Sequence, residues 1–299
     1  MKKGVFLLLL VTSSLFLLIG CQSQENAEEA TSNSVDPSME SETDIEMDDE
    51  QKESTTDTDK PETTEQPSKE TVIEEEPPIM YRLNEENWAL EPIAEDVDEN
   101  VLLLTIDDVP DKNALKMAQL LKDLEIPAIF FANGHFLETE EDYATLRQIH
   151  DLGFHIGNHT MTHPVLSDVS EERQREEIIQ LNTLIEEIIG EKPKFFRAPH
   201  GMNTDYVRQL VKEEGMLLMN WTYGYDYFEP YMDAEKLKQA MITGEGPEVD
   251  VPYSLLRPGA NLLMHDREWT LEALEDIVKG LQEKGYSFVD PNTIELPTS

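Results

Sequence analysis

Two histidines, His159 and His163, lie four residues apart in the run Gly-Asn-His-Thr-Met-Thr-His-Pro. A pair of carboxylates, Asp107 and Asp108, ends an apolar run earlier in the chain, and His265 ends a later one. Two imidazoles and one carboxylate are enough to hold a divalent metal ion while leaving positions open for water and substrate. One carboxylate and one histidine are then left over, which is the pair that a hydrolytic reaction uses as base and acid.

A further polar motif, Arg197-Ala-Pro-His-Gly, follows a short apolar run. Its Pro199 and Gly201 predict a tight turn, which would aim a backbone N–H near His200 at a substrate, as in an oxyanion hole. Beside a carboxylate, a buried Arg197 would keep that carboxylate ionised, as a general base requires.

Taken singly, each motif also has an ordinary structural explanation. The Asp-Asp pair is compatible with a turn that caps a helix, the two histidines with a structural loop, and Arg197 with a surface position in a β–α loop. A lone His265 is more typical of the edge of a core. Their joint occurrence, each after an apolar run, favours a shared site.

Apolar runs and amphipathic stretches alternate from about residue 100 onward. Continuous apolar runs predict strands buried on both faces of a parallel sheet, at residues 101–106, 126–131, 154–157, 194–197, 216–221, 261–265 and 286–289. Helical spacing of apolar residues predicts helices at residues 112–124, 138–152, 170–189, 204–214, 233–242 and 269–284. Roughly seven β–α pairs are typical of a parallel barrel or a doubly wound sheet.

The positions of the polar residues discriminate between these two folds. Asp107, His159, Arg197, Asp226 and His265 each follow a different predicted strand. All strand C-termini meet at one face of a parallel barrel, whereas an open sheet would spread them apart. We therefore predict an α/β barrel.

Together the motifs resemble those of the polysaccharide deacetylase family, the family 4 carbohydrate esterases that share the NodB homology domain. The resemblance covers roughly residues 100–290. Five motifs follow the family's order, the fifth only in part. The four closer ones are Thr105-Ile-Asp-Asp-Val-Pro for Thr-Phe-Asp-Asp-Gly-Pro, His159-Thr-Met-Thr-His-Pro for His-Ser/Thr-x-x-His-Pro, Arg197-Ala-Pro-His-Gly for Arg-x-Pro-Tyr-Gly, and Leu263-Met-His for Leu-x-His.

The resemblance implies a distorted (β/α)7 barrel and a role for each motif. It implies that Asp107 is the base, that His265 is the acid, and that Asp108, His159 and His163 hold a divalent metal. The implied metal is Zn²⁺, with Co²⁺, Ni²⁺ or Mn²⁺ as alternatives. The implied reaction removes the acetyl group from an N-acetylated sugar, and its products are acetate and a glucosamine unit.

The oxyanion and substrate contacts are predicted at His200, through its backbone N–H, and at Trp221. Trp221 begins an aromatic cluster with Tyr223, Tyr225 and Tyr227. Such a cluster is more typical of a core, but we expect one or two of its members to stack on sugar rings.

Three motifs depart from the family pattern. Val109 replaces Gly and adds bulk beside the base, and His200 replaces Tyr. The family's Asp-x-x-Asp-Trp is only partly present, with Asp226 and Tyr227 in its last two positions. We expect Asp226 to orient Arg197 in place of the missing Asp, or else a low activity.

The N-terminus has the features of an export signal. Lys2 and Lys3 precede an apolar stretch at residues 5–19, which has the length of a signal peptide and is short for a membrane span. It ends in Leu-Ile-Gly-Cys21, which resembles the lipobox of bacterial lipoproteins, and Cys21 is the single cysteine. We predict a signal peptide at residues 1–20 and lipidation of Cys21; the alternative is a short uncleaved anchor.

Composition divides the remainder into two parts. Residues 21–78 are rich in Glu, Asp, Ser, Thr and Pro and predict a disordered acidic linker. Residues 79–299 are enough for one α/β domain. The formal net charge of −40 argues against nucleic acid as a partner, and a monomer is expected.

These features predict an exported lipoprotein, anchored to the outer face of the cytoplasmic membrane, that deacetylates a wall glycan such as peptidoglycan N-acetylglucosamine. One alternative is an inactive domain that binds wall glycan through the same site. Another is the facial triad of non-haem iron oxygenases, which also consists of two histidines and a carboxylate. The spare Asp107 and His265 argue against the oxygenase, because oxygen chemistry has no evident need of them.

Overall fold

The computed structural model describes residues 77–298. The predicted signal peptide, Cys21 and nearly all of the predicted linker lie outside the described residues. Within residues 77–298, every helix is too short or too polar to serve as a membrane span.

Seven parallel strands form the central sheet, and the ends of all of them lie within three residues of the predicted positions. Their order is β7-β6-β5-β4-β3-β8, and β9 pairs with the beginning of β3. The strands are β3 (Val101–Val109), β4 (Ile129–Ala132), β5 (His155–Asn158), β6 (Phe195–Phe196), β7 (Leu217–Leu218), β8 (Asn261–His265) and β9 (Ser287–Phe288). All nine residues of β3 are buried, as expected for a strand covered on both faces.

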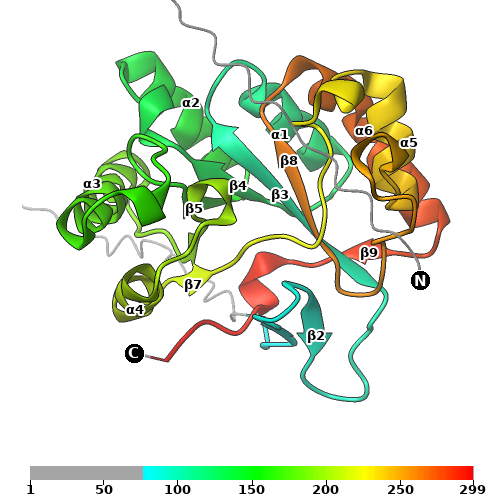
Figure 1. Ribbon diagram of the computed structural model, residues 1–299, viewed down its shortest axis with the longest axis horizontal. Helices are drawn as coiled ribbons and strands as arrows, with labels where there is room; N and C mark the ends of the chain where they lie inside the picture. The colour runs from blue at the N-terminus through cyan, green and yellow to red at the C-terminus, as the bar shows by residue number, and fades with distance from the viewer. Residues whose placement is uncertain (1–76, 299) are drawn as a thin grey trace, which may run out of the picture. The chain divides into compact units, whose positions relative to one another are not determined.

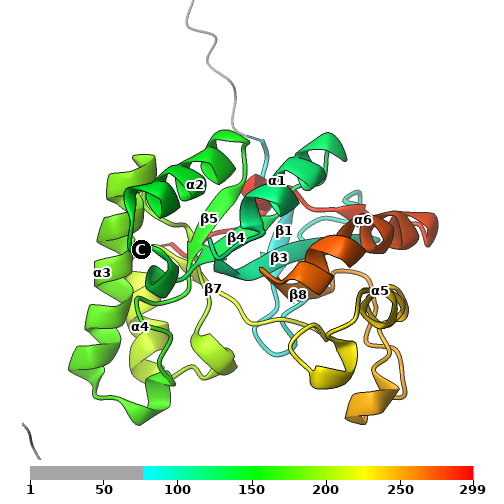
Figure 2. The same ribbon diagram turned by 90° about the horizontal axis from the view of Figure 1, so that it is seen from above.

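Six helices connect the strands and cover the outer face of the sheet, each within two residues of its predicted bounds. Figures 1 and 2 show α2, α3 and α4 along one side of the sheet and α5 and α6 along the other. The helices are α1 (Ala114–Asp123), α2 (Glu140–Asp151), α3 (Glu171–Ile189), α4 (Asp205–Glu213), α5 (Ala234–Thr243) and α6 (Glu268–Glu283). Side-chain caps begin several of them; Ser170, for example, accepts a hydrogen bond from the third residue of α3.

The sheet curls because the segment after β7 changes partner. β7 itself pairs with β6, but Thr222 donates a backbone hydrogen bond to Asn261 and Leu263 donates one to Tyr223, both on the side of β8. A single stretch of chain that begins at β7 therefore pairs first with β6 and then with β8. This confirms the prediction of a distorted (β/α)7 barrel.

The side chains of β3 alternate between two hydrophobic cores, one on each face of the sheet. Leu102, Leu104 and Ile106 pack in the cluster between the sheet and the helices, whereas Val101 and Leu103 point into the barrel. Because side chains alternate along a strand, Thr105 and Asp107 follow on the barrel side, at the C-terminal end of the strand.

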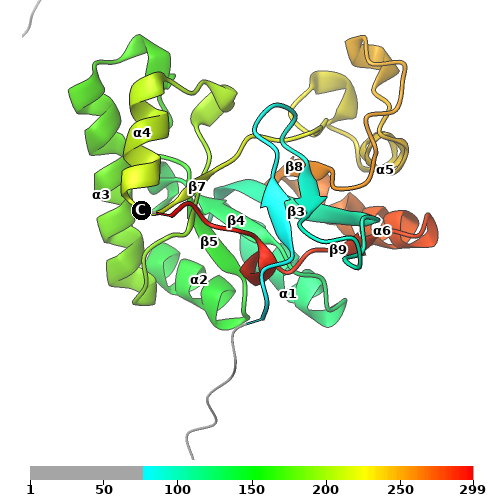
Figure 3. The same cartoon turned by 90° about the horizontal axis from the view of Figure 1, so that it is seen from below.

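An antiparallel hairpin, which the sequence did not indicate, closes the opposite end of the barrel. It consists of β1 (Tyr81–Leu83) and β2 (Leu90–Pro92), and its Tyr81 and Leu90 belong to the core inside the barrel. Tyr81 also bridges to Ile294, so the hairpin lies beside the C-terminal residues (Figures 1 and 3). The segment before β3 thus packs on the domain and closes this end of the barrel.

Candidate active site

A cavity of about 430 Å³ opens at the C-terminal ends of the strands. It brings together seven of the predicted site residues with three others. Its lining consists of Asp107, Asp108, His159, His163, His200, Trp221, Tyr227, Leu263, His265 and Arg267. The remaining two predicted site residues in the described part of the chain, Arg197 and Asp226, lie directly behind this lining and are fully buried.

An irregularity at the end of β3 turns both carboxylates into the cavity. In a regular strand Asp108 would point away from the face that carries Asp107. The pairing of β3 with β4 shifts register between Ile106 and Val109, and Asp108 has a φ of 61°, in the left-handed region that non-glycine residues rarely adopt. The side chain of Val109 packs in the core between sheet and helices, so the expectation that it adds bulk beside the base is wrong.

Asp108, His159 and His163 form a compact set of metal-ligand atoms. One ligand atom from each lies within 4.8 Å of the others. Asp108 Oδ1 lies 3.9 Å from His159 Nε2 and 3.6 Å from His163 Nε2. Ligands at the usual 2.0–2.2 Å from a tetrahedral zinc ion are about 3.4 Å apart, so this donor set fits a divalent metal with only small adjustment.

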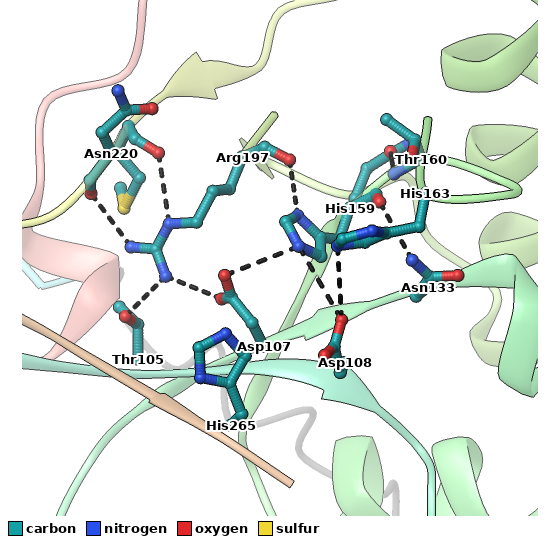
Figure 4. A network of polar contacts seen from close by, with 12 residues as sticks. Thr105, Asp107, Asp108, Asn133, His159, Thr160, His163, Arg197, Asn220 and His265 are labelled. Atoms are coloured by element: carbon teal, nitrogen blue, oxygen red, sulfur yellow. Dashed lines mark hydrogen bonds and ion pairs between the residues drawn. The ribbon is translucent and has the colours of Figure 1, made fainter. Parts of the chain in front are cut away.

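The spacing of four residues between the two histidines predicts a helical turn that places both imidazoles on one side, and this prediction is wrong. Residues 159–163 form an irregular loop after β5, in which Thr160 has a φ of 69° and His163 a φ of 57°. The spacing of four residues brings the imidazoles together through this loop instead. Their ring centroids are 5.0 Å apart (Figure 4).

The protonation states of the set suit metal binding. Burial, together with the neighbouring imidazole of His159, lowers the pKa of His163 to about 4, so its ring is neutral and can act as a ligand. Burial alone would raise the pKa of Asp108, but the surrounding imidazoles and the Arg267 guanidinium lower it below its ordinary value. His159 Nδ1 lies 2.7 Å from the carbonyl oxygen of Arg197 and donates to it, which leaves Nε2 free to face the site.

Arg197 spans the inside of the barrel and holds Asp107. Its Nη1 donates to Asp107 Oδ1 at 2.7 Å and to Thr105 Oγ1 at 2.7 Å. The other guanidinium nitrogens donate to the carbonyls of Met219 and Asn220 and to the Asn261 side chain, so all five N–H donors are used. The predicted pairing of a buried Arg197 with a carboxylate is present, and that carboxylate is Asp107.

Asp226 does not contact Arg197, so its predicted role in orienting that arginine is wrong. The carboxylate of Asp226 instead accepts from His265 Nδ1 at 2.8 Å, from the His265 backbone N–H at 2.6 Å and from Thr270 Oγ1 at 2.8 Å. Burial alone would lower the pKa of His265, but the Asp226 carboxylate outweighs it and raises that pKa. His265 also pairs with Asp107 in the register of β3 and β8, so the two side chains are neighbours across the strands.

The turn predicted after β6 is present as a single 3₁₀ turn over Pro199–Gly201. His200 is exposed at the cavity, with a φ of 57°, and its ring centroid lies 4.9 Å from that of His163. Trp221 and Tyr227 also line the cavity, and Tyr227 is 40% exposed. Of the aromatic cluster, only these two members reach the cavity, whereas Tyr223 and Tyr225 are core residues, as expected for most of such a cluster.

Two residues of the site went unnoticed in the sequence, and both follow His265 directly. Arg267 donates to Asp108 Oδ2 at 2.8 Å. Asp266 accepts from three backbone N–H groups at residues 111, 113 and 114 and so ties the end of β8 to the beginning of α1. The adjacent polar run His-Asp-Arg after an apolar strand was the available signal.

These features define a class of protein: a curled parallel α/β barrel with a candidate divalent-metal centre on its C-terminal face. Residues 94–219 match the family model for polysaccharide deacetylase. The uncharacterized protein YlxY of Bacillus subtilis is 30% identical over 172 residues, which cover 58% of this chain and 50% of that protein. A peptidoglycan-N-acetylglucosamine deacetylase of Bacillus cereus is 29% identical over 192 residues, covering 62% of this chain and 65% of that protein.

Solved structures agree with the family model. A pseudoenzyme of carbohydrate esterase family 4 from Bacillus anthracis superposes with a TM-score of 0.57 at 25% identity, covering 66% of this chain and 67% of that one. The chain spans between half and two thirds of the length of the two curated relatives above. Residues 94–219 are thus similar to polysaccharide deacetylases, and the described part of the chain has a fold like that of this carbohydrate esterase family 4 structure.

Proposed function

We propose that this protein is a metal-dependent deacetylase that hydrolyses the N-acetyl groups of a cell-wall glycan, with peptidoglycan N-acetylglucosamine as its substrate. The observation that supports this most directly is the convergence, around one cavity, of a metal-ligand set with a spare carboxylate and a spare histidine. The likeness to a peptidoglycan-N-acetylglucosamine deacetylase supports the choice of substrate.

In this proposal Asp108, His159 and His163 hold the metal. When bound, Zn²⁺, or alternatively Co²⁺, Ni²⁺ or Mn²⁺, supplies Lewis-acid polarisation of the acetyl carbonyl and lowers the pKa of a water. Asp107 is the general base. Arg197 donates a hydrogen bond to Asp107 Oδ1. Asp107 Oδ2 lies 3.6 Å from His159 Nε2, on the side of the metal ligands, and is free to take the proton of the attacking water.

His265 is the proposed general acid. Its Nδ1 is held by Asp226, which leaves Nε2 as the nitrogen that gives a proton to the departing amine when the C–N bond breaks. The oxygen of water ends in acetate and the sugar is left with a free amine. The backbone N–H near His200 is the proposed donor to the oxyanion, and Trp221 is the proposed sugar contact.

We expect the purified, Zn²⁺-loaded protein to release acetate from chitooligosaccharides and from peptidoglycan fragments. Mass spectrometry of the fragments should show acetyl loss from N-acetylglucosamine, and a chelator should abolish the reaction until Zn²⁺ is restored. Acetyl loss only from N-acetylmuramic acid would overturn the choice of sugar. Activity that survives complete metal removal would overturn the role of the metal.

The likeness to a pseudoenzyme gives a second candidate, an inactive domain that binds wall glycan. It predicts metal binding and retention on peptidoglycan without acetate release in the same experiment. The described chain favours the active form, because the proposed base, acid and metal ligands are all present around the cavity.

We further propose that the protein is exported and lipid-anchored through Cys21 to the outer face of the cytoplasmic membrane, facing the cell wall. The support is the lipobox-like run that ends in the single cysteine and the acidic segment that follows it. We expect a Cys21→Ala variant to move from the membrane fraction, as followed by immunoblotting of fractionated cells. Unchanged membrane attachment of that variant would argue for the uncleaved anchor instead.

A further inference from the structure

The loop that supplies two proposed metal ligands has an uncommon backbone. Thr160 and His163 both have positive φ, 69° and 57°, and neither is a glycine. Such conformations persist only where the surrounding structure over-determines them. The loop at residues 159–163 therefore needs contacts from elsewhere in the fold to keep this shape.

Helix α3 supplies these contacts through its backbone. The N–H of Met161 donates to the carbonyl oxygen of Glu177 at 3.0 Å. The amide of Asn158, at the end of β5, donates to the carbonyl of Ile178 at 2.9 Å, and its oxygen accepts from the N–H of Thr160 at 2.8 Å. One turn of α3 thus holds the loop near its beginning and its middle.

The side chain of Glu177 supplies the remaining contact. Its carboxylate accepts from the N–H of Thr162 at 2.7 Å and from the Thr162 hydroxyl at 2.5 Å, and Arg173 pairs with the same carboxylate. The Glu177 side chain is 0% exposed. A fully buried carboxylate persists only when it is paired and hydrogen-bonded, and here two of its partners are the donors of a single loop residue.

The two histidine ligands differ in how they are held. His159 donates from Nδ1 to a buried carbonyl, which fixes its ring. Within residues 77–298, the ring of His163 makes no such hydrogen bond to another residue, so its position follows from the backbone. Thr162 is the residue immediately before His163, and Glu177 fixes that residue at two atoms.

We infer that Glu177 is a positioning residue for the metal site: it holds the loop through Thr162 and thereby places the imidazole of His163. This inference rests on the proposed metal site and adds a buried carboxylate from α3 to it. Residues that orient metal ligands typically contribute about 10- to 100-fold in metal affinity or activity. Glu177 does not touch metal or substrate, so its effect should appear as looser metal binding in a folded protein.

The test is the Zn²⁺ affinity of the apoprotein, measured by competition with a fluorescent chelator. We expect Glu177→Gln to weaken Zn²⁺ binding by about 10- to 100-fold. Only the oxygen of an amide can accept a hydrogen bond, so the NH₂ group of the new side chain would face a donor of Thr162 or Arg173. Circular dichroism should show an unchanged fold, and Zn²⁺ in excess should restore glycan deacetylation.

Glu176→Gln is the matched control. Glu176 is the adjacent residue on α3 and also pairs with Arg173, at 3.0 Å, but it is exposed and does not reach the loop. Its variant should keep the wild-type Zn²⁺ affinity. Equal losses in the two variants, or an unchanged affinity in folded Glu177→Gln, would overturn the inference.

Thr162→Val covers the case in which Glu177→Gln does not fold. It removes the hydroxyl but keeps the backbone N–H donor, so we expect a smaller loss of Zn²⁺ affinity than in Glu177→Gln, about tenfold, at the low end of the range for such contacts. Wild-type affinity in Thr162→Val would then overturn the inference. A protein that shows these affinity changes but never releases acetate would leave the inference intact and refute the deacetylase proposal alone.

Discussion

The Asp107→Asn variant is expected to lose about 10²- to 10⁴-fold in turnover with N-acetylated glycans while it keeps its metal. The amide preserves the shape of the side chain and can still accept from Arg197, which lies 2.7 Å from Oδ1. It cannot take a proton from the attacking water. Acetate release at saturating Zn²⁺ and the zinc content of the same sample are the two measurements.

Asp123→Asn is a suitable control, because this carboxylate is exposed on α1 and lies outside the cavity lining. It should leave both quantities unchanged. Loss of zinc from Asp107→Asn would mean that Asp107 acts as a metal ligand, and unchanged turnover would remove it as the base.

The His265→Ala variant is expected to lose a similar 10²- to 10⁴-fold with N-acetylated glycans, again with its metal retained. An amine is a poor leaving group unless it receives a proton, and the structure offers His265 as the donor next to Asp107. An aryl acetate ester releases a stabilised phenolate that needs no proton. We therefore expect the same variant to lose only about tenfold or less with such an ester.

The comparison of the two substrates separates acid from base, since Asp107→Asn should impair the reactions of both substrates equally.

Asp226→Asn gives a finer test of the acid. Asp226 raises the pKa of His265, and only the protonated imidazole can act as acid, so activity should fall as pH rises through that pKa. Removing the negative charge of Asp226 should lower the pKa of His265, so the fall of kcat/KM on the alkaline side of the pH profile (its alkaline limb) should move to lower pH. An unmoved limb would show that another group titrates there.

The alternation of strands and helices was predictable because burial imposes its own pattern on the residues. A strand covered on both faces must be apolar throughout, and a helix with one covered face must be apolar at helical spacing. The predicted helix at residues 170–189 and the observed α3, Glu171–Ile189, show how closely this determines the elements. The β1–β2 hairpin was not predicted, because its strands have only three residues each, too few to show a periodic pattern of apolar residues.

The members of the site were predictable for a related reason. Asp107, His159 and His265 each end an apolar strand, and strand ends meet at one face of a barrel. The types of these residues indicated metal and acid–base chemistry, and the cavity contains all three.

Which side chain touches which was decided by the tertiary structure. Asp226 pairs with His265 and not with Arg197, because the chain after β7 crosses to the side of β8 before it reaches residue 226. The loop of His159 and His163 is irregular and not helical, because contacts from α3 hold backbone angles that the local sequence does not favour.

The sequence by itself determined the parallel α/β architecture, the order of the elements and the residues that gather at one face. Each of these depends on periodicity and residue type, which are properties of neighbours along the chain. Only the folded structure decided the partners of Asp226, Asp266 and Glu177, because a hydrogen bond between residues far apart in the chain leaves no periodic trace. Those buried contacts determine the orientation of the proposed acid and of the proposed metal ligands.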